Sequence, residues 1–150
     1  MYDRILLPTD GSEGVSRAID HAIDAAERYD AELHVLYVVD APAVNAYSGD
    51  EFVHEFEGME QTLEDEGIDA VGEIAARAED AGVDDVVTEV VHGTPYEQIL
   101  RYIDEHDVDL TVMGTKERSG DYRRMLGSVT ERVSRLSSRP VSIIKTAVEE

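Results

Sequence analysis

The sequence of 150 residues contains no cysteine, and only two of its thirteen basic residues are lysine. The absence of cysteine excludes disulfide bonds, thiolate catalysis, iron–sulfur clusters and cysteine-based zinc sites. No apolar run approaches the roughly 18 residues that cross a bilayer, and the N-terminus turns polar too early for a signal peptide. We therefore expect a cytoplasmic protein with no membrane partner, whose residues 1–150 form a single domain.

Positive charge is also scarce. Thirteen basic residues stand against 34 acidic ones, which gives a formal net charge of −21. Nucleic acids and anionic membrane surfaces both require a basic face, so we expect neither as a partner. An acidic, lysine-poor composition is typical of proteins from a salt-loaded cytoplasm, where ions screen the self-repulsion. We therefore expect a halophilic archaeon as the source and weaker folding at low ionic strength.

The basic residues that do occur are concentrated in one segment. Residues 116–139 hold seven of the thirteen, and only three acidic residues, so this segment carries +4 while the remainder carries −25. An anionic ligand is most easily accommodated there.

Five short apolar runs have the composition of strands that are buried on both faces. They cover residues 5–7, 33–39, 86–91, 110–113 and 141–144.

Helical patterns separate these runs. An apolar face at residues 15–26 predicts the first helix, with Ser12 as its N-cap. A longer acidic helix is expected from about 52 to 81, although three glycines weaken it, and Gly82 fits its C-terminal stop. Thr94 and Ser128 each begin an S/T-x-x-E pattern, which predicts a capping box at the start of two further helices.

The predicted order is therefore strictly alternating, from strand to helix to strand. Helical crossovers join parallel strands with right-handed connections. We expect an α/β fold: a doubly wound, five-stranded parallel sheet with helices on both faces.

In such a sheet, ligands bind beyond the carboxyl ends of the strands, where the winding reverses. The first strand ends near Asp10 and the fourth near Gly114, so their loops would face each other if the strands are neighbours. Asp10 could then accept a hydrogen bond from a ribose or hold a metal–phosphate group. It could equally do no more than cap the turn.

A second candidate site is the sequence Gly127-Ser128-Val129-Thr130 at the start of the last helix. A glycine there lets a phosphate approach the free backbone N–H groups, and the two hydroxyls add donors. The alternative is a plain helix cap that binds nothing.

Several catalytic patterns are missing from the sequence. It contains no P-loop, no G-x-S-x-G elbow and no H-E-x-x-H zinc motif. No residue is clearly placed as a general base, so we expect no catalytic residue, no metal site and no enzyme activity beyond slow ATP hydrolysis.

Taken together, the motifs resemble those of the universal stress protein family (UspA-like) over essentially the whole chain. Four segments carry the resemblance: Ile5–Ser12, Val91–Pro95, Val112–Thr115 and Leu126–Val133. The resemblance implies a stress-response sensor or regulator that binds ATP or a related adenine nucleotide, with or without Mg²⁺. It also implies a homodimer that pairs through the last strand, where an apolar edge favours pairing.

The resemblance further implies the ligand contacts. Asp10 and Val38 would border the adenosine, Pro8 and Thr9 would shape that wall, and Met113 and Gly114 would lie alongside the nucleotide. The phosphates would lie against Gly127, Ser128, Val129 and Thr130. Core packing alone also explains Val38 and Met113.

One position departs from the family pattern of Gly, two residues, Gly, nine residues, and Gly followed by Ser or Thr. Glu117 occupies the place of the middle glycine and brings a side chain and a negative charge toward the phosphates. The alternative function is therefore a nucleotide-free interaction and dimerisation module of the same family. A phospho-acceptor receiver and an adenylating enzyme fit less well, because their acidic pair and Ser-Gly-Gly-x-Asp-Ser loop are missing.

Overall fold

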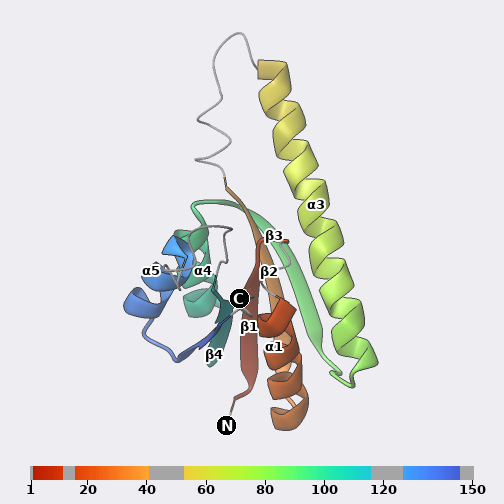
Figure 1. Ribbon diagram of the computed structural model, residues 1–150, viewed down its shortest axis with the longest axis vertical. Coiled ribbons are helices and arrows are strands. Elements are labelled where there is room, and N and C mark those ends of the chain that lie inside the picture. The colour runs from red at the N-terminus through yellow and green to blue at the C-terminus, as the bar shows by residue number, and fades with distance from the viewer. Residues whose placement is uncertain (1, 12–15, 41–52, 116–126, 146–150) are drawn as a thin grey trace, which may run out of the picture.

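The computed structural model describes residues 2–11, 16–40, 53–115 and 127–145, in which strands and helices alternate (Figure 1). The elements are β1 (Arg4–Thr9), α1 (Ser16–Tyr29), β2 (Glu32–Asp40), α3 (Val53–Asp80), β3 (Val86–Gly93), α4 (Pro95–Glu105), β4 (Leu110–Gly114), α5 (Ser128–Leu136) and β5 (Val141–Ile144).

All five strands join one parallel sheet in the order β3-β2-β1-β4-β5. The chain therefore winds outward from β1 to β3, crosses back, and continues from β4 to β5. This confirms the predicted doubly wound α/β fold. It also makes β1 and β4 neighbours, with Leu6 paired to Thr111, so the winding reverses between them.

Two helices cover each face of the sheet (Figure 1). The helices α1 and α3 pack on one face with every second residue of β1 and β2, including Ile5, Leu7 and Tyr37. The helices α4 and α5 pack on the other face, with Leu6 and Leu36 between them and the sheet. Because strand residues alternate between faces, both sides of the central strands are buried, as their continuous apolar runs predict.

Helix α3 is the longest element, and its amino-terminal part projects beyond the sheet (Figure 1). It runs unbroken through Gly58, Gly67 and Gly72. The predicted stop at Gly82 is confirmed, since this glycine follows the helix with a φ of +105° that other residues rarely adopt.

The predicted capping box at α4 is not formed. Thr94 is the N-cap and Pro95 opens the helix, as expected, but the Thr94 side chain makes no capping hydrogen bond. The predicted N-cap Ser12 lies outside the described residues.

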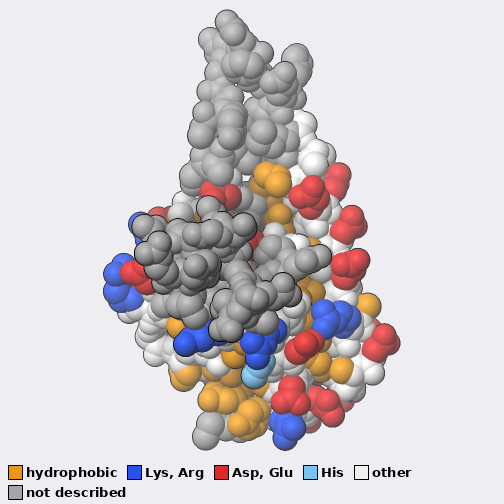
Figure 2. Space-filling model, viewed as in Figure 1, with side chains coloured by type: hydrophobic (Ala, Val, Ile, Leu, Met, Phe, Trp, Pro, Cys, Tyr) orange, Lys and Arg blue, Asp and Glu red, His pale blue; other side chains and the backbone are white. Residues whose placement is uncertain are grey.

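Acidic side chains are spread along the side of the molecule where α3 lies (Figure 2). Among the residues that the structure describes, every helix is too short or too polar to span a bilayer.

Candidate functional site

The carboxyl ends of β1 and β4 lie side by side at the reversal of the winding. Parallel pairing of Ile5 with Leu110 and of Leu6 with Thr111 aligns the two strands. The amide of Thr115, just after β4, donates to the Ile144 carbonyl at 3.0 Å and ties β5 to the same edge. The structure therefore confirms the adjacency on which the predicted site depends.

The turn after β1 is built around two residues that flank Asp10. Thr9 is buried, and its hydroxyl oxygen accepts a hydrogen bond from the Gly11 amide at 3.1 Å. Gly11 has a φ of +77°, which favours glycine over any residue with a side chain. This local turn leaves Asp10 exposed at the tip.

The start of α5 differs from the predicted capping box. Gly127 is the N-cap, in extended conformation, and Ser128 is already the first helical residue. Because Ser128 lies inside the helix and not at the N-cap, the predicted capping box of Ser128 and Glu131 is not formed. The first-turn amides of Ser128, Val129 and Thr130 have no intrahelical acceptor, which gives this end of the helix a partial positive charge.

A hydrogen bond fixes this helix to the end of β4. The Thr130 hydroxyl donates to the Gly114 carbonyl at 3.0 Å, and Thr130 itself is 5% exposed. We predicted that this hydroxyl would face a phosphate, and in the structure it holds α5 against the strand. Gly114 and Gly127–Thr130, far apart in the sequence, thereby come together.

The remaining predicted residues form the apolar surroundings of this edge. Met113 belongs to the core beneath α4 and α5, and both Val38 and Val129 pack against that core. Pro8 is buried in β1. Met113 and Val38 thus take part in core packing, which is one of the two roles that the sequence left open for them. Lys116, Glu117, Arg118, Gly120, Arg123 and Arg124 lie outside the described residues.

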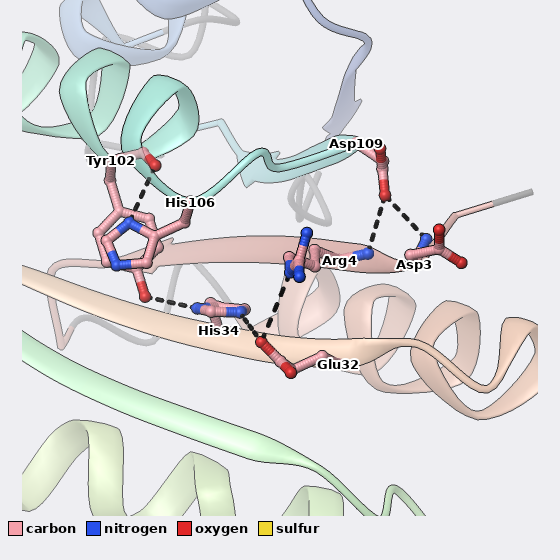
Figure 3. A network of polar contacts seen from close by, with 7 residues as sticks. All are labelled: Asp3, Arg4, Glu32, His34, Tyr102, His106 and Asp109. Atoms are coloured by element: carbon pink, nitrogen blue, oxygen red, sulfur yellow. Dashed lines mark hydrogen bonds and ion pairs between the residues drawn. The ribbon is translucent and has the colours of Figure 1, made fainter.

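Sequence reasoning missed a polar network near the opposite ends of the strands (Figure 3). The Tyr102 hydroxyl donates to His34 Nδ1, and His34 Nε2 donates to Glu32 Oε1, each at 2.5 Å. His106 stacks on the Tyr102 ring with centroids 3.8 Å apart. The spacing of the histidines gives no sign of this network, because His34 is buried within a strand and its partner Tyr102 lies in α4.

Burial sets the protonation of this network. It lowers the pKa of His34, against the opposing effect of Glu32, and it raises the pKa of Tyr102. Both groups therefore stay neutral near pH 7, and a neutral imidazole with its proton on Nε2 satisfies both neighbours.

A groove and the arrangement of acidic and histidine side chains are also relevant to ligand binding. A shallow groove of about 490 Å³ between α1 and α3 is lined by Asp20, Ile23, Asp24, Glu27, Arg77, Asp80 and Ala81, none of which belongs to the predicted site. Within the described part of the chain, no group of three or more His, Asp or Glu side chains is arranged to hold a metal ion.

An open parallel sheet with a glycine-capped helix at its switch point defines a class of α/β proteins suited to binding phosphate-bearing ligands. Residues 1–145 match the Universal stress protein family, and the chain belongs to that family.

Individual relatives agree with this assignment. The chain is 36% identical to "Universal stress protein MJ0531" of Methanocaldococcus jannaschii over 150 residues, covering 100% of this chain and 86% of the relative. Its structure matches the universal stress protein UspA from Lactobacillus plantarum with a TM-score of 0.86 and 27% identity, over 96% and 98% of the two chains. It also matches a universal stress protein solved in complex with cAMP, with a TM-score of 0.70 and 27% identity, over 97% and 98%.

Proposed function

We propose that this universal stress protein binds ATP or a related adenine nucleotide at the carboxyl ends of β1 and β4 and acts as a stress-response sensor or regulator. The observation that carries the proposal is the start of α5. There a helix begins at a glycine N-cap, which has no side chain, next to Gly114 and at the reversal of the winding. Support comes from the structural relative that was solved with cAMP.

In this proposal the phosphates lie against the amides of Ser128, Val129 and Thr130, with Gly127 allowing close approach. Asp10 accepts from the ribose or adenine, and Pro8, Thr9 and Val38 shape the adenosine wall. Met113 and Gly114 lie alongside. Mg²⁺ would accompany the phosphates of ATP.

The test replaces the N-cap glycine, Gly127, by a residue whose side chain can cap the helix. In Gly127→Asp, a carboxylate caps the first-turn amides and repels phosphate, so calorimetry should show ATP binding weakened by about tenfold or more. The melting temperature should stay equal or rise, because Asp is a good N-cap. Ser138→Asp adds the same charge beyond the far end of α5 and should leave the affinity unchanged. Equal affinity in wild type and Gly127→Asp would contradict the proposed phosphate position.

The alternative function is a nucleotide-free interaction module, which Glu117 favours. Titration of the wild type with Mg-ATP, Mg-ADP, AMP and cAMP separates the two, since the module binds none of them. Glu117→Gly should then increase the affinity if the acidic side chain opposes phosphate binding. We also expect no more than slow turnover, and a phosphate-release assay with saturating ATP checks this.

The proposal includes association of two copies through β5. This strand lies at one edge of the sheet, and all four of its residues are only partly buried in the single chain. An uncovered apolar edge favours pairing with a second copy. Light scattering should give a dimer mass at micromolar protein, and Ser142→Lys, which adds charge to the edge, should lower it toward the monomer.

The acidic surface fits a cytoplasm with high salt. If so, the melting temperature should rise by roughly 10 °C between low and molar KCl, which is about 3 kcal/mol of relieved self-repulsion. A melting temperature that stays flat over this range would contradict adaptation to salt.

A further inference from the structure

The ring of Tyr37 lies between the turn after β1 and helix α3. Tyr37 is in β2, is 7% exposed, and belongs to the core beneath α1 and α3. Strand pairing sets it beside Thr9, the last residue of β1. The ring is therefore next to the turn that carries Asp10.

On one side, the ring touches the backbone of α3 at Gly67. A Cβ atom at this position would lie 2.5 Å from Cδ1 of Tyr37 and 2.9 Å from Cγ. These atoms belong to the fixed part of the ring, so any side chain at position 67 would displace the ring or the helix. Glycine is a poor helix former, and this contact explains its presence in the middle of α3.

The other edge of the Tyr37 ring faces the turn. A Cβ atom at Gly11 would lie 3.6 Å from Cε2 of Tyr37 and 3.9 Å from Cβ of Ala70, which is on the same face of α3 as Gly67. Burial first, and then the charges of Glu66 and Asp10, raise the pKa of Tyr37, so the phenol stays neutral. The ring thus bridges α3 and the turn without adding charge.

We infer that Tyr37 is a positioning residue through which α3 sets the conformation of the turn at residues 9–11 and hence the place of Asp10 in the nucleotide site. Protein cores are close-packed, so a shift of α3 at Gly67 must move the ring, which lies next to the turn. The effect on affinity rests on the proposed nucleotide binding, whereas the mechanical coupling does not. By linkage, anything that shifts α3 changes nucleotide affinity, and a bound nucleotide biases α3 by the same factor.

Two glycines of the same helix provide the test and its control. Gly67→Ala should increase amide exchange at residues 9–11 and weaken ATP binding by about tenfold, because overpacking displaces the ring. Gly72 has nothing within 4 Å of its Cβ position, so Gly72→Ala should leave both measurements unchanged. Equal exchange at residues 9–11 in Gly67→Ala and wild type would overturn the coupling.

Substitutions of Tyr37 test the same contact without adding volume. Tyr37→Phe keeps the ring and should retain the wild-type exchange at residues 9–11 and the wild-type affinity, whereas Tyr37→Leu should increase the exchange and weaken ATP binding. A loss of affinity in Tyr37→Phe as large as in Tyr37→Leu would assign the effect to the hydroxyl and overturn the positioning role of the ring.

The two proposals fail in different ways. If wild-type protein binds no nucleotide in calorimetry, the proposed function fails, while the exchange comparison between Gly67→Ala and Gly72→Ala still decides the coupling. If ATP binds but the exchange at residues 9–11 stays unchanged in both Gly67→Ala and Tyr37→Leu, the coupling fails and the function stands.

Discussion

The two ends of the sheet differ in which groups form the polar contacts. At the carboxyl ends of β1 and β4, the contacts rely on backbone groups and hydroxyls, as in the bonds from Gly11 to Thr9 and from Thr130 to Gly114. Toward the amino end, charged and aromatic side chains pair with one another in the network of Figure 3. At the amino end, polar side chains satisfy one another, whereas at the carboxyl end α5 begins at a glycine N-cap that has no side chain.

This difference separates stability from binding. Hydrogen-bonded side chains stabilise the fold but leave little for a ligand, whereas a bare helix start binds an anion and contributes little to stability. Changes near the amino end should therefore alter the free energy of unfolding and not the affinity for nucleotide.

The largest effect is expected at Asp109, just before β4. Its Oδ2 accepts from the amides of Asp3 and Arg4 at 2.8 and 3.0 Å, and its Oδ1 lies 3.6 Å from Arg139. Asp109→Ala leaves two amides without their charged acceptor and should cost about 2 kcal/mol of unfolding free energy. Urea denaturation measures this cost, and calorimetry should show ATP affinity within about twofold of wild type.

The next prediction concerns acid. Burial lowers the pKa of His34, and His106 and Arg4 lower it further, whereas Glu32 raises it. In the unfolded chain histidine titrates near its ordinary value of about 6.5, so below that pH the unfolded state binds the proton more readily. The contribution to stability is therefore complete above about pH 6.5 and is lost as the pH falls toward the folded pKa.

Urea denaturation at several pH values between 7 and 5 checks this prediction. His34→Gln keeps a donor for Glu32 and an acceptor for Tyr102 but does not titrate, so its stability should fall less over this range. If the variant and the wild type have the same slope, His34 is not the group responsible.

The pKa of Asp109 is also lowered, because hydrogen bonds from two backbone amides and the nearby arginines outweigh the effect of its burial. The stability that Asp109 contributes is lost only below about pH 4, outside the range of this experiment.

A smaller effect, of opposite sign, is expected in the middle of the sheet. Thr111 is fully buried in β4, and within the described structure its hydroxyl has no hydrogen-bond partner. Thr111→Val removes this unsatisfied group while keeping the shape, and should stabilise the protein by about 1 kcal/mol. A lower melting temperature in this variant would indicate a hydrogen bond that the described contacts lack.

The fold could be predicted because its signals are local. Continuous apolar runs placed β2 at residues 33–39, against Glu32–Asp40 in the structure, and a helical face placed α1 at residues 15–26, against Ser16–Tyr29. The contacts that connect distant segments could not be predicted. His34 and Tyr102 are 68 residues apart, and nothing in either segment indicates that one hydroxyl will meet one imidazole.

The switch point of the sheet was predictable, whereas the details of the candidate site were not. The switch point followed once β1 and β4 proved to be neighbours. The predictions of capping boxes were wrong because the S/T-x-x-E pattern shows only which side chains could form the bonds. Which residue becomes the N-cap depends on where the backbone leaves the helical conformation. At α5 that residue is Gly127, one position earlier than predicted, and at α4 Thr94 takes the right place without using its hydroxyl.

The smallest effect tests this last point. Replacing a capping threonine by alanine ordinarily costs about 1 kcal/mol, because the helix loses an acceptor for its first-turn amides. The Thr94 side chain makes no such bond, so Thr94→Ala should change the free energy of unfolding by no more than about 0.3 kcal/mol, as for a surface substitution. Urea denaturation decides it, with Asp109→Ala as the reference for a residue whose side chain does bond to backbone amides. A cost near 1 kcal/mol would mean that Thr94 caps α4 in solution, and the carboxyl end of the sheet would then depend on side-chain capping more than its contacts indicate.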